Sequence, residues 1–219
     1  MPSSPVPARR LTADQRRRQI LGSARELMLD RGLDEVSVES AAEQAGVSPG
    51  LLFHYFGSQG GFRDALVELV AQELLEQIAP DRTLAPSAQL RSGIERFVDT
   101  VVRHPKLYQA VARHGARGGP GRMAGLHRAA RATMADWITG AVATAGADRT
   151  PRLRLAVAGW LAFMEEAVLG ALSGVEVGRD DLVDLCERTA YQVLETAVAD
   201  PARWPAVRAA LDRPPQPES

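Results

Sequence analysis

The chain has 219 residues, 45% of them hydrophobic, and a formal net charge of −1 at pH 7. This length allows one large domain or two small ones, and the near-neutral charge excludes a generally basic coat, so any nucleic-acid contact must be local. The single cysteine, Cys186, excludes an intramolecular disulfide, and no uninterrupted apolar run reaches the roughly 18 residues of a membrane span, so we expect a cytoplasmic protein without a membrane partner.

The chain begins with a basic arm, residues 1–10, that we expect to be disordered. Residues 12–15, Thr-Ala-Asp-Gln, have the form of a capping box and predict the start of a helix that Gly32 ends. The apolar stripe of this helix consists of Ile20, Leu21, Ala24, Leu27 and Met28. Arg16, Arg17 and Arg18 gather at its start, where they could meet phosphates or could form an ordinary solvated face.

Residues 36–56 predict two short helices folded over one tight turn. Ser37 can cap the first helix, and Gly46 stands where the chain must reverse and adopt positive φ. Ser48 and Pro49 form a cap and first-turn pair for the second helix. Together with the preceding helix, the pattern is that of a three-helix, helix-turn-helix domain over residues 11–60, whose common use is to place its second helix in the major groove of DNA.

The motifs Ala45-Gly-Val-Ser48 and Leu52-Phe-His-Tyr-Phe56 resemble the N-terminal signature of the TetR/AcrR family of transcriptional regulators, over roughly residues 12–70. The resemblance implies an all-α fold of about nine to ten helices, in which a C-terminal helical domain binds a ligand and dimerises. Two departures stand out. Gln59 occupies the place of a usual Lys that meets a phosphate, and Gly60 and Gly61 replace an acidic pair.

A set of ten residues is predicted to bind DNA. They are Arg17, Ser37, Ser48, Pro49, Gly50, Leu51, Phe53, His54, Tyr55 and Gln59. In the family, the positions of Leu51 and Phe53 tend to face bases, and those of His54 and Tyr55 tend to hold the backbone. Phe53 offers only an apolar face, which suits a thymine methyl group. The alternative for Phe53, and more strongly for Phe56, is packing in the core.

Residues 61–212 predict further helices separated by Pro and Gly, followed by a disordered Pro-rich tail at 213–219. The first expected helix carries an apolar stripe that starts with Phe62 and runs until Pro80, and the second runs from a cap at Ser87 to Pro105. A later helix contains Leu126 and is closed by Gly146, and two more run from Pro151 through Val168 and from Leu182 to Val198. The segment from Gly115 to Gly121 is expected to be a connector.

The helix over residues 182–198 is apolar on more than one face, so one face must be covered by a partner. The resemblance implies that this helix and the one beginning at Pro151 form a two-fold, four-helix interface. The predicted interface residues are Leu153, Val157, Trp160, Met164, Leu182, Leu185, Cys186 and Val193. A homodimer on a palindromic double-stranded operator is expected, because one short helix reads few base pairs and half-sites lie about one helical turn (~34 Å) apart.

The resemblance also implies a small-molecule effector in the C-terminal domain. The candidate lining residues are Phe97, Val101, His104, Tyr108, Met123, His127, Met134, Trp137, Phe163 and Glu166, each of which could instead be an ordinary core residue. Glu165 and Glu166 are adjacent and cannot share a helix face. One of them could favour a cationic ligand, or could meet solvent or an Arg.

The four histidines show no metal-binding spacing, and the glycine-rich segment 115–121 lacks a phosphate-binding ending. We therefore expect no enzyme, no metal and no cofactor. The leading hypothesis is a homodimeric, sequence-specific repressor that a small molecule releases from its operator. The alternative is a DNA-binding regulator whose C-terminal domain only dimerises or binds a protein partner, and an apolar cavity in that domain distinguishes the two.

Overall fold

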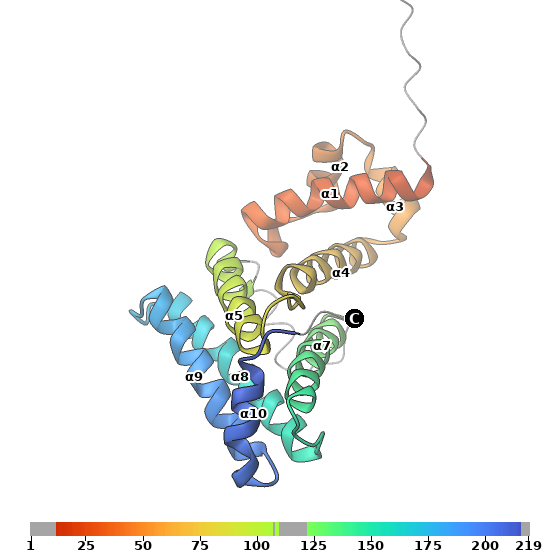
Figure 1. Ribbon diagram of the computed structural model, residues 1–219. Coiled ribbons are helices and arrows are strands. Elements are labelled where there is room, and N and C mark those ends of the chain that lie inside the picture. The colour runs from red at the N-terminus through yellow and green to blue at the C-terminus, as the bar shows by residue number, and fades with distance from the viewer. Residues whose placement is uncertain (1–11, 107, 110–121, 216–219) are drawn as a thin grey trace, which may run out of the picture. The chain divides into compact units, whose positions relative to one another are not determined.

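The computed structural model describes residues 12–106, 108–109 and 122–215, which form nine α-helices, two short 3-10 helices and no strand (Figure 1). The predicted all-α class is confirmed. The chain forms two compact units, Met1–Val70 and Ala71–Ser219, and helix α4 (Gln59–Ile78) contributes residues to both. The predicted arm at 1–10, the connector at 115–121 and most of the tail at 213–219 lie outside the described residues.

In the first unit, α1 (Ala13–Arg31) begins at the predicted capping box. The Gln15 N–H donates to Thr12 Oγ1 at 3.2 Å, and the Thr12 N–H donates to Gln15 Oε1 at 2.9 Å. The helix ends at Gly32, whose φ of 95° a side chain would not favour, and the predicted apolar stripe is buried throughout. A 3-10 turn, η1 (Leu33–Glu35), leads to the next helix.

Helices α2 (Val38–Ala45) and α3 (Pro49–Phe56) form the predicted helix-turn-helix. The Ser37 hydroxyl accepts from the Ser40 N–H at 3.0 Å, and Gly46 takes the left-handed conformation with φ of 66°. The predicted side-chain cap by Ser48 is absent, because the Leu51 N–H donates to the Ser48 carbonyl oxygen at 3.0 Å instead. Pro49 therefore starts α3 through its fixed φ alone.

The second unit contains the end of α4 and, in its described residues, a bundle of five further α-helices (Figure 1). These are α5 (Pro86–Arg103), α7 (Arg122–Thr144), α8 (Pro151–Leu172), α9 (Arg179–Ala197) and α10 (Trp204–Leu211), the last preceded by η2 (Pro201–Arg203). Helix α8 packs against α7 and α9, and α5 packs against α9. One apolar core joins all of them.

Two predicted helix starts are corrected. Helix α5 begins at Pro86, so Ser87 is its second residue rather than its cap, because Pro is well suited to the first position of a helix. Helix α9 begins at Arg179, three residues before Leu182, with Asp180 and Asp181 in its first turn. Carboxylates are favourable there because the helix dipole is positive at that end. The predicted start of α8 at Pro151 is confirmed, with Thr150 as its cap.

Candidate nucleic-acid interface and ligand cavity

Helix α3 is attached to its unit through one buried side chain, Leu52, which is 1% exposed. Pro49, Gly50 and His54 are exposed, and Phe53 is 45% exposed. Phe53 therefore does not pack into the core of this unit. A two-turn helix with most of its surface free has the dimensions of an element that enters the major groove, which is about 12 Å wide.

The end of α3 is held against the start of α4 by close backbone packing. Gly57 takes a φ of 75°, and the Gly61 N–H donates to Ser58 Oγ at 3.0 Å. A Cβ atom at Gly61 would overlap the carbonyl oxygen of Phe56, so this position requires glycine. The departure from the family pattern at Gly61 thus has a steric reason.

Phe56 is half-buried and packs edge-to-face on the fully buried Phe62, with ring centroids 5.2 Å apart. The core-packing alternative for Phe56 is confirmed. Its other neighbour is Arg17, whose guanidinium lies 5.1 Å from the ring centroid. This contact brings one positive charge from α1 to the C-terminal end of α3. It joins residues 39 positions apart, and no pattern in the sequence signals it.

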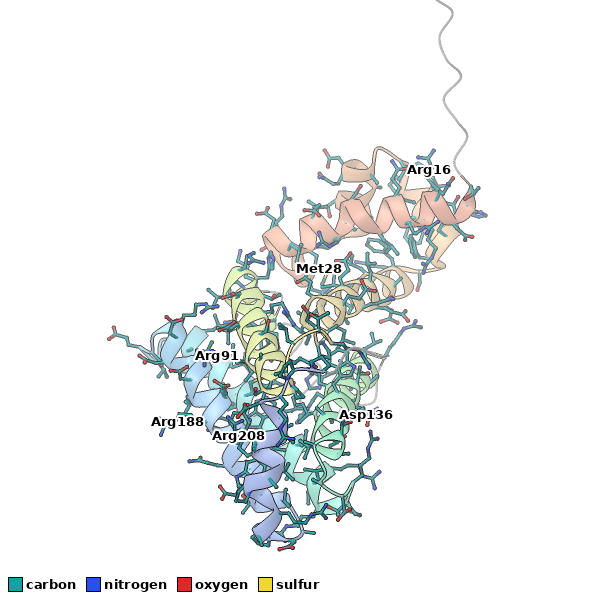
Figure 2. The ribbon with its side chains drawn as sticks, in the orientation of Figure 1. Arg16, Met28, Arg91, Asp136, Arg188 and Arg208 are labelled. Carbon is teal, nitrogen blue, oxygen red and sulfur yellow. The ribbon has the colours of Figure 1, made fainter. Side chains whose placement is uncertain are left out.

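Positive charge in the described part of this unit, residues 12–70, comes almost entirely from α1. Residues 12–70 contain six arginines, no lysine and nine carboxylates, and none of these arginines lies between Gly32 and Phe62. Arg16, Arg17 and Arg18 form one group at the start of α1, and Figure 2 labels Arg16 at this end of the helix. Gln59 is exposed at the first position of α4 and brings no charge.

The second unit contains a cavity of about 100 Å³ bounded by five helices and the end of α4. Its lining includes three of the predicted pocket residues, Phe97, Met134 and Trp137. The remaining lining residues are Ile78, Pro80, Pro86, Ser87, Gln89, Leu90, Gly93, Ile94, Ile138, Ala141, Val142, Trp160, Leu161, Met164, Tyr191, Leu194 and Leu211. None of these side chains is charged.

The other predicted pocket residues whose side chains are described do not line this cavity. Val101 is buried in the core, His104 ends α5, and Tyr108 packs edge-to-face on Phe97 with ring centroids 5.4 Å apart. Phe163 and Glu166 are exposed on α8, so we do not retain them as lining residues. The side chain of Met123 lies outside the described residues.

Glu165 is paired within the protein, which confirms the alternative of an Arg partner. Its carboxylate lies 3.2 Å from His127 Nε2 and 3.6 Å from Arg131 Nη1, and all three side chains are largely buried. Burial, and then the charge of Glu165, raise the pKa of the neighbouring Tyr108. Because the Glu165 charge has protein partners and is not part of the cavity lining, it gives no reason to expect a cationic ligand.

Six of the eight predicted interface residues belong to the core of the protomer itself. Leu153, Val157, Trp160, Met164, Leu182 and Cys186 are each at most 4% exposed. The Trp160 Nε1–H donates to the Cys186 carbonyl oxygen at 3.0 Å, which ties α8 to α9. Helical spacing reveals that a helix has two apolar faces, but it does not reveal which face meets its own core.

A different apolar surface remains open on α8 and α9, and we name it the outer α8–α9 face. It consists of Leu155, Ala158, Gly159, Ala162, Phe163 and Leu185. Leu155 is 76% exposed and Leu185 is 47% exposed. Length and composition alone would allow α8 to cross a membrane, but its opposite face is buried in the protein core, so the property reflects a helix that is apolar on two faces.

Comparison with known proteins gives a consistent picture. Residues 20–73 match the model for bacterial regulatory proteins of the tetR family. FasR, an HTH-type transcriptional activator of Mycolicibacterium smegmatis, is 30% identical over 104 residues, which cover 47% of this chain and 48% of FasR. The chain thus spans about half the length of the curated relatives it matches.

The fold likeness extends over nearly the whole chain. The crystal structure of a tetR-family transcriptional regulator from Streptomyces coelicolor has a TM-score of 0.79 and 26% identity, and the match covers 93% of this chain and 92% of that one. RolR, solved in complex with resorcinol, has a TM-score of 0.57 and 19% identity over 93% of this chain and 97% of its own, which shows the fold alone. FasR and the Streptomyces coelicolor protein are both named as regulators of transcription.

Proposed function

We propose that this chain, which belongs to the TetR family, is a homodimeric repressor that binds a palindromic operator and is released from it by a small molecule. The observation that carries the proposal is helix α3. Leu52 is its one fully buried side chain, and Phe53 and His54 are exposed at the end of a helix-turn-helix. Such a protein acts in the cytoplasm, where the bacterial DNA is.

In the proposed complex, α3 enters the major groove. Leu51 and Phe53 face base edges, and His54 and Tyr55 contact the sugar-phosphate backbone. Ser48, Pro49 and Gly50 let the start of the helix approach the DNA closely, since they carry little side-chain bulk. Ser37, at the N-terminus of α2, adds amides that favour a phosphate.

The proposed phosphate contacts depend on Arg17 in particular. This chain lacks the family's usual Lys at position 59, and residues 33–62, which include both helices of the helix-turn-helix, contain no Arg or Lys. Arg17 stands above Phe56, at the end of α3, and its guanidinium is free to extend to a phosphate because the residue is exposed. We propose that Arg17 makes the phosphate contact of the missing lysine, and that Arg16 and Arg18 add positive charge beside it at the start of α1.

The outer α8–α9 face is proposed as the dimer interface. On α8 this face presents small residues between the larger Leu155 and Phe163, which allows helices of two copies to approach closely. The test is light scattering at micromolar protein. A dimer is expected for the parent chain and for Val102→Arg, a control site on α5 that is 58% exposed, and a monomer is expected for Leu155→Arg. A monomeric parent chain would contradict this proposal.

The cavity favours a ligand-responsive regulator over one whose C-terminal unit only dimerises. Helix α4 begins beside the HTH and ends at Ile78, which lines the cavity, so a ligand that shifts this residue acts on a helix shared by both units. RolR, a protein of the same fold, was solved with the small molecule resorcinol. We expect ligand and operator to weaken one another by a coupling of about 1 to 3 kcal/mol.

The decisive experiment is selection of genomic DNA fragments by the purified protein. We expect saturable binding that weakens with salt and is lost when His54 and Tyr55 are both replaced by alanine. Failure to retain any fragment, or unchanged binding by the double variant, would contradict the proposal. The position of the selected site relative to its promoter gives the sign of regulation, which matters because the relative FasR is named an activator.

A further inference from the structure

The cavity in the second unit is selective in its chemistry. We infer that its ligand is a neutral, largely apolar molecule about the size of one six-membered ring, carrying a single hydroxyl or carbonyl oxygen. The inference deepens the proposed function, since it takes this cavity as the effector site.

The first argument is the absence of charge among the lining side chains. Ser87 and Gln89 are the two lining residues with non-aromatic polar side chains, and Gln89 Nε2 already donates to the Leu84 carbonyl oxygen at 2.8 Å. The indole N–H of Trp160 is occupied by Cys186, so Trp160 offers the cavity its ring. A carboxylate or ammonium group placed here would lose its hydration without gaining a counter-charge.

The second argument is one polar position in the lining. The Tyr191 hydroxyl is buried, and its hydrogen-bonding neighbour is the hydroxyl of Ser87, which also lines the cavity. The Arg208 guanidinium lies 4.0 Å from the centroid of the Tyr191 ring and pairs with Asp212 at 2.5 Å (Figure 2 labels Arg208). Burial raises the pKa of Tyr191 to about 12, so the hydroxyl keeps its proton, and this pair of hydroxyl groups can share a hydrogen bond with one ligand oxygen.

The third argument is size and shape. The cavity volume is about 100 Å³. An apolar cavity of roughly 150 Å³ in another protein takes up benzene, so a single ring is about the upper limit of the molecule that this cavity accommodates. Phe97, Trp137 and Trp160 supply flat faces on which such a ring can stack.

The test uses three probes of one shape, namely benzyl alcohol, benzylamine and benzoate, at pH 7. The protein contains three tryptophans, and Trp137 and Trp160 line the cavity while Trp204 does not, so binding is read from fluorescence in a Trp204→Phe background. Benzyl alcohol should bind saturably. Benzylamine and benzoate should bind at least about 100-fold more weakly, because each would bury an unpaired charge.

Two variants locate the site. Ala141→Leu fills the cavity and should abolish binding of benzyl alcohol, whereas Ala132→Leu, on the exposed face of the same helix, should leave it unchanged. Tyr191→Phe should weaken the binding of benzyl alcohol roughly 5- to 10-fold and leave the binding of toluene unchanged, because only the alcohol has an oxygen that can accept a hydrogen bond from Tyr191. Circular dichroism of each variant reports whether it folds.

Three results would overturn the inference: charged probes that bind as tightly as benzyl alcohol, an Ala141→Leu variant that is folded and still binds, or no binding by any probe. These failures are distinct from failure of the proposed function. If the protein retains operator fragments but none of the probes binds, only the ligand class is wrong. If benzyl alcohol binds as expected and operator affinity does not change, the ligand class stands and effector release fails.

Discussion

The two units place the aromatic side chains that we assign to function in opposite ways. In the helix-turn-helix unit, Phe53 and His54 point to solvent, and the buried interior consists largely of aliphatic and small residues from α1 and α2. In the C-terminal unit, Phe97, Trp137 and Trp160 turn inward around an incompletely filled core. The first unit therefore presents its functional residues on a surface, where substitution leaves stability intact, and the second keeps them in a core, where function and packing are coupled.

The largest expected effect compares surface and core within the first unit, at two phenylalanines nine positions apart. Phe62 is fully buried and Phe53 is 45% exposed. Phe62→Ala should lower the free energy of unfolding by about 3 to 5 kcal/mol, because it leaves a cavity beneath Phe56. Phe53→Ala should change it by less than about 0.5 kcal/mol. Urea unfolding followed by circular dichroism measures both, and a strongly destabilised Phe53→Ala protein would show that Phe53 belongs to the core.

The next effect concerns the charge that α1 brings to the end of α3. Arg17→Ala should lower operator affinity roughly tenfold at 0.1 M salt and reduce the slope of log K against log salt by about one unit per protomer. Gln59→Lys should change both quantities in the opposite direction by adding a phosphate contact. Filter binding over a salt series gives the slopes.

Arg25→Ala provides the control, since Arg25 lies on the same helix and pairs with Glu26 at 2.5 Å. Its salt slope should equal that of the parent chain. Equal slopes for Arg17→Ala and the parent would show that Arg17 only packs on Phe56.

A smaller effect is expected from removing single methyl groups from the DNA. Replacing a contacted thymine by deoxyuracil deletes the C5 methyl group and keeps every hydrogen-bonding atom. The parent protein should lose about fivefold in affinity at the thymine opposite Phe53, because an apolar contact is removed. Phe53→Ala should bind the two duplexes equally. If the parent protein does not distinguish them at any half-site thymine, Phe53 does not read a thymine methyl group.

The smallest effect is an expected absence of change at Cys186. Its thiol is fully buried in the core of the protomer, and burial raises its pKa to about 11. Labelling by a thiol reagent at pH 8 should therefore be slow and should not accelerate when the protein is diluted below its dimerisation range. Faster labelling on dilution would place Cys186 in the dimer interface, as the sequence pattern first suggested.

The sequence by itself determined the helix-turn-helix and most helix boundaries. The capping residues Thr12, Ser37 and Thr150 and the turn residues Gly32 and Gly46 act through hydrogen bonds and backbone sterics within a few residues, so their effects can be read locally. Ser48 stands at the predicted N-cap of α3 without a capping hydrogen bond from its side chain, and Ser87 is not the cap of α5, for an equally local reason. At both places a proline starts the helix without help from a hydroxyl group.

Only the tertiary structure decided which face of α8 and α9 is buried, since both faces of each helix are apolar enough to serve. It placed Trp160, Met164 and Cys186 inside the protomer and left Leu155 and Leu185 outside. It also decided the stacking of Arg17 on Phe56, the steric need for glycine at position 61 and which residues line the cavity. These features depend on contacts between separate helices, and the periodicity of one helix contains no information about which neighbour it meets.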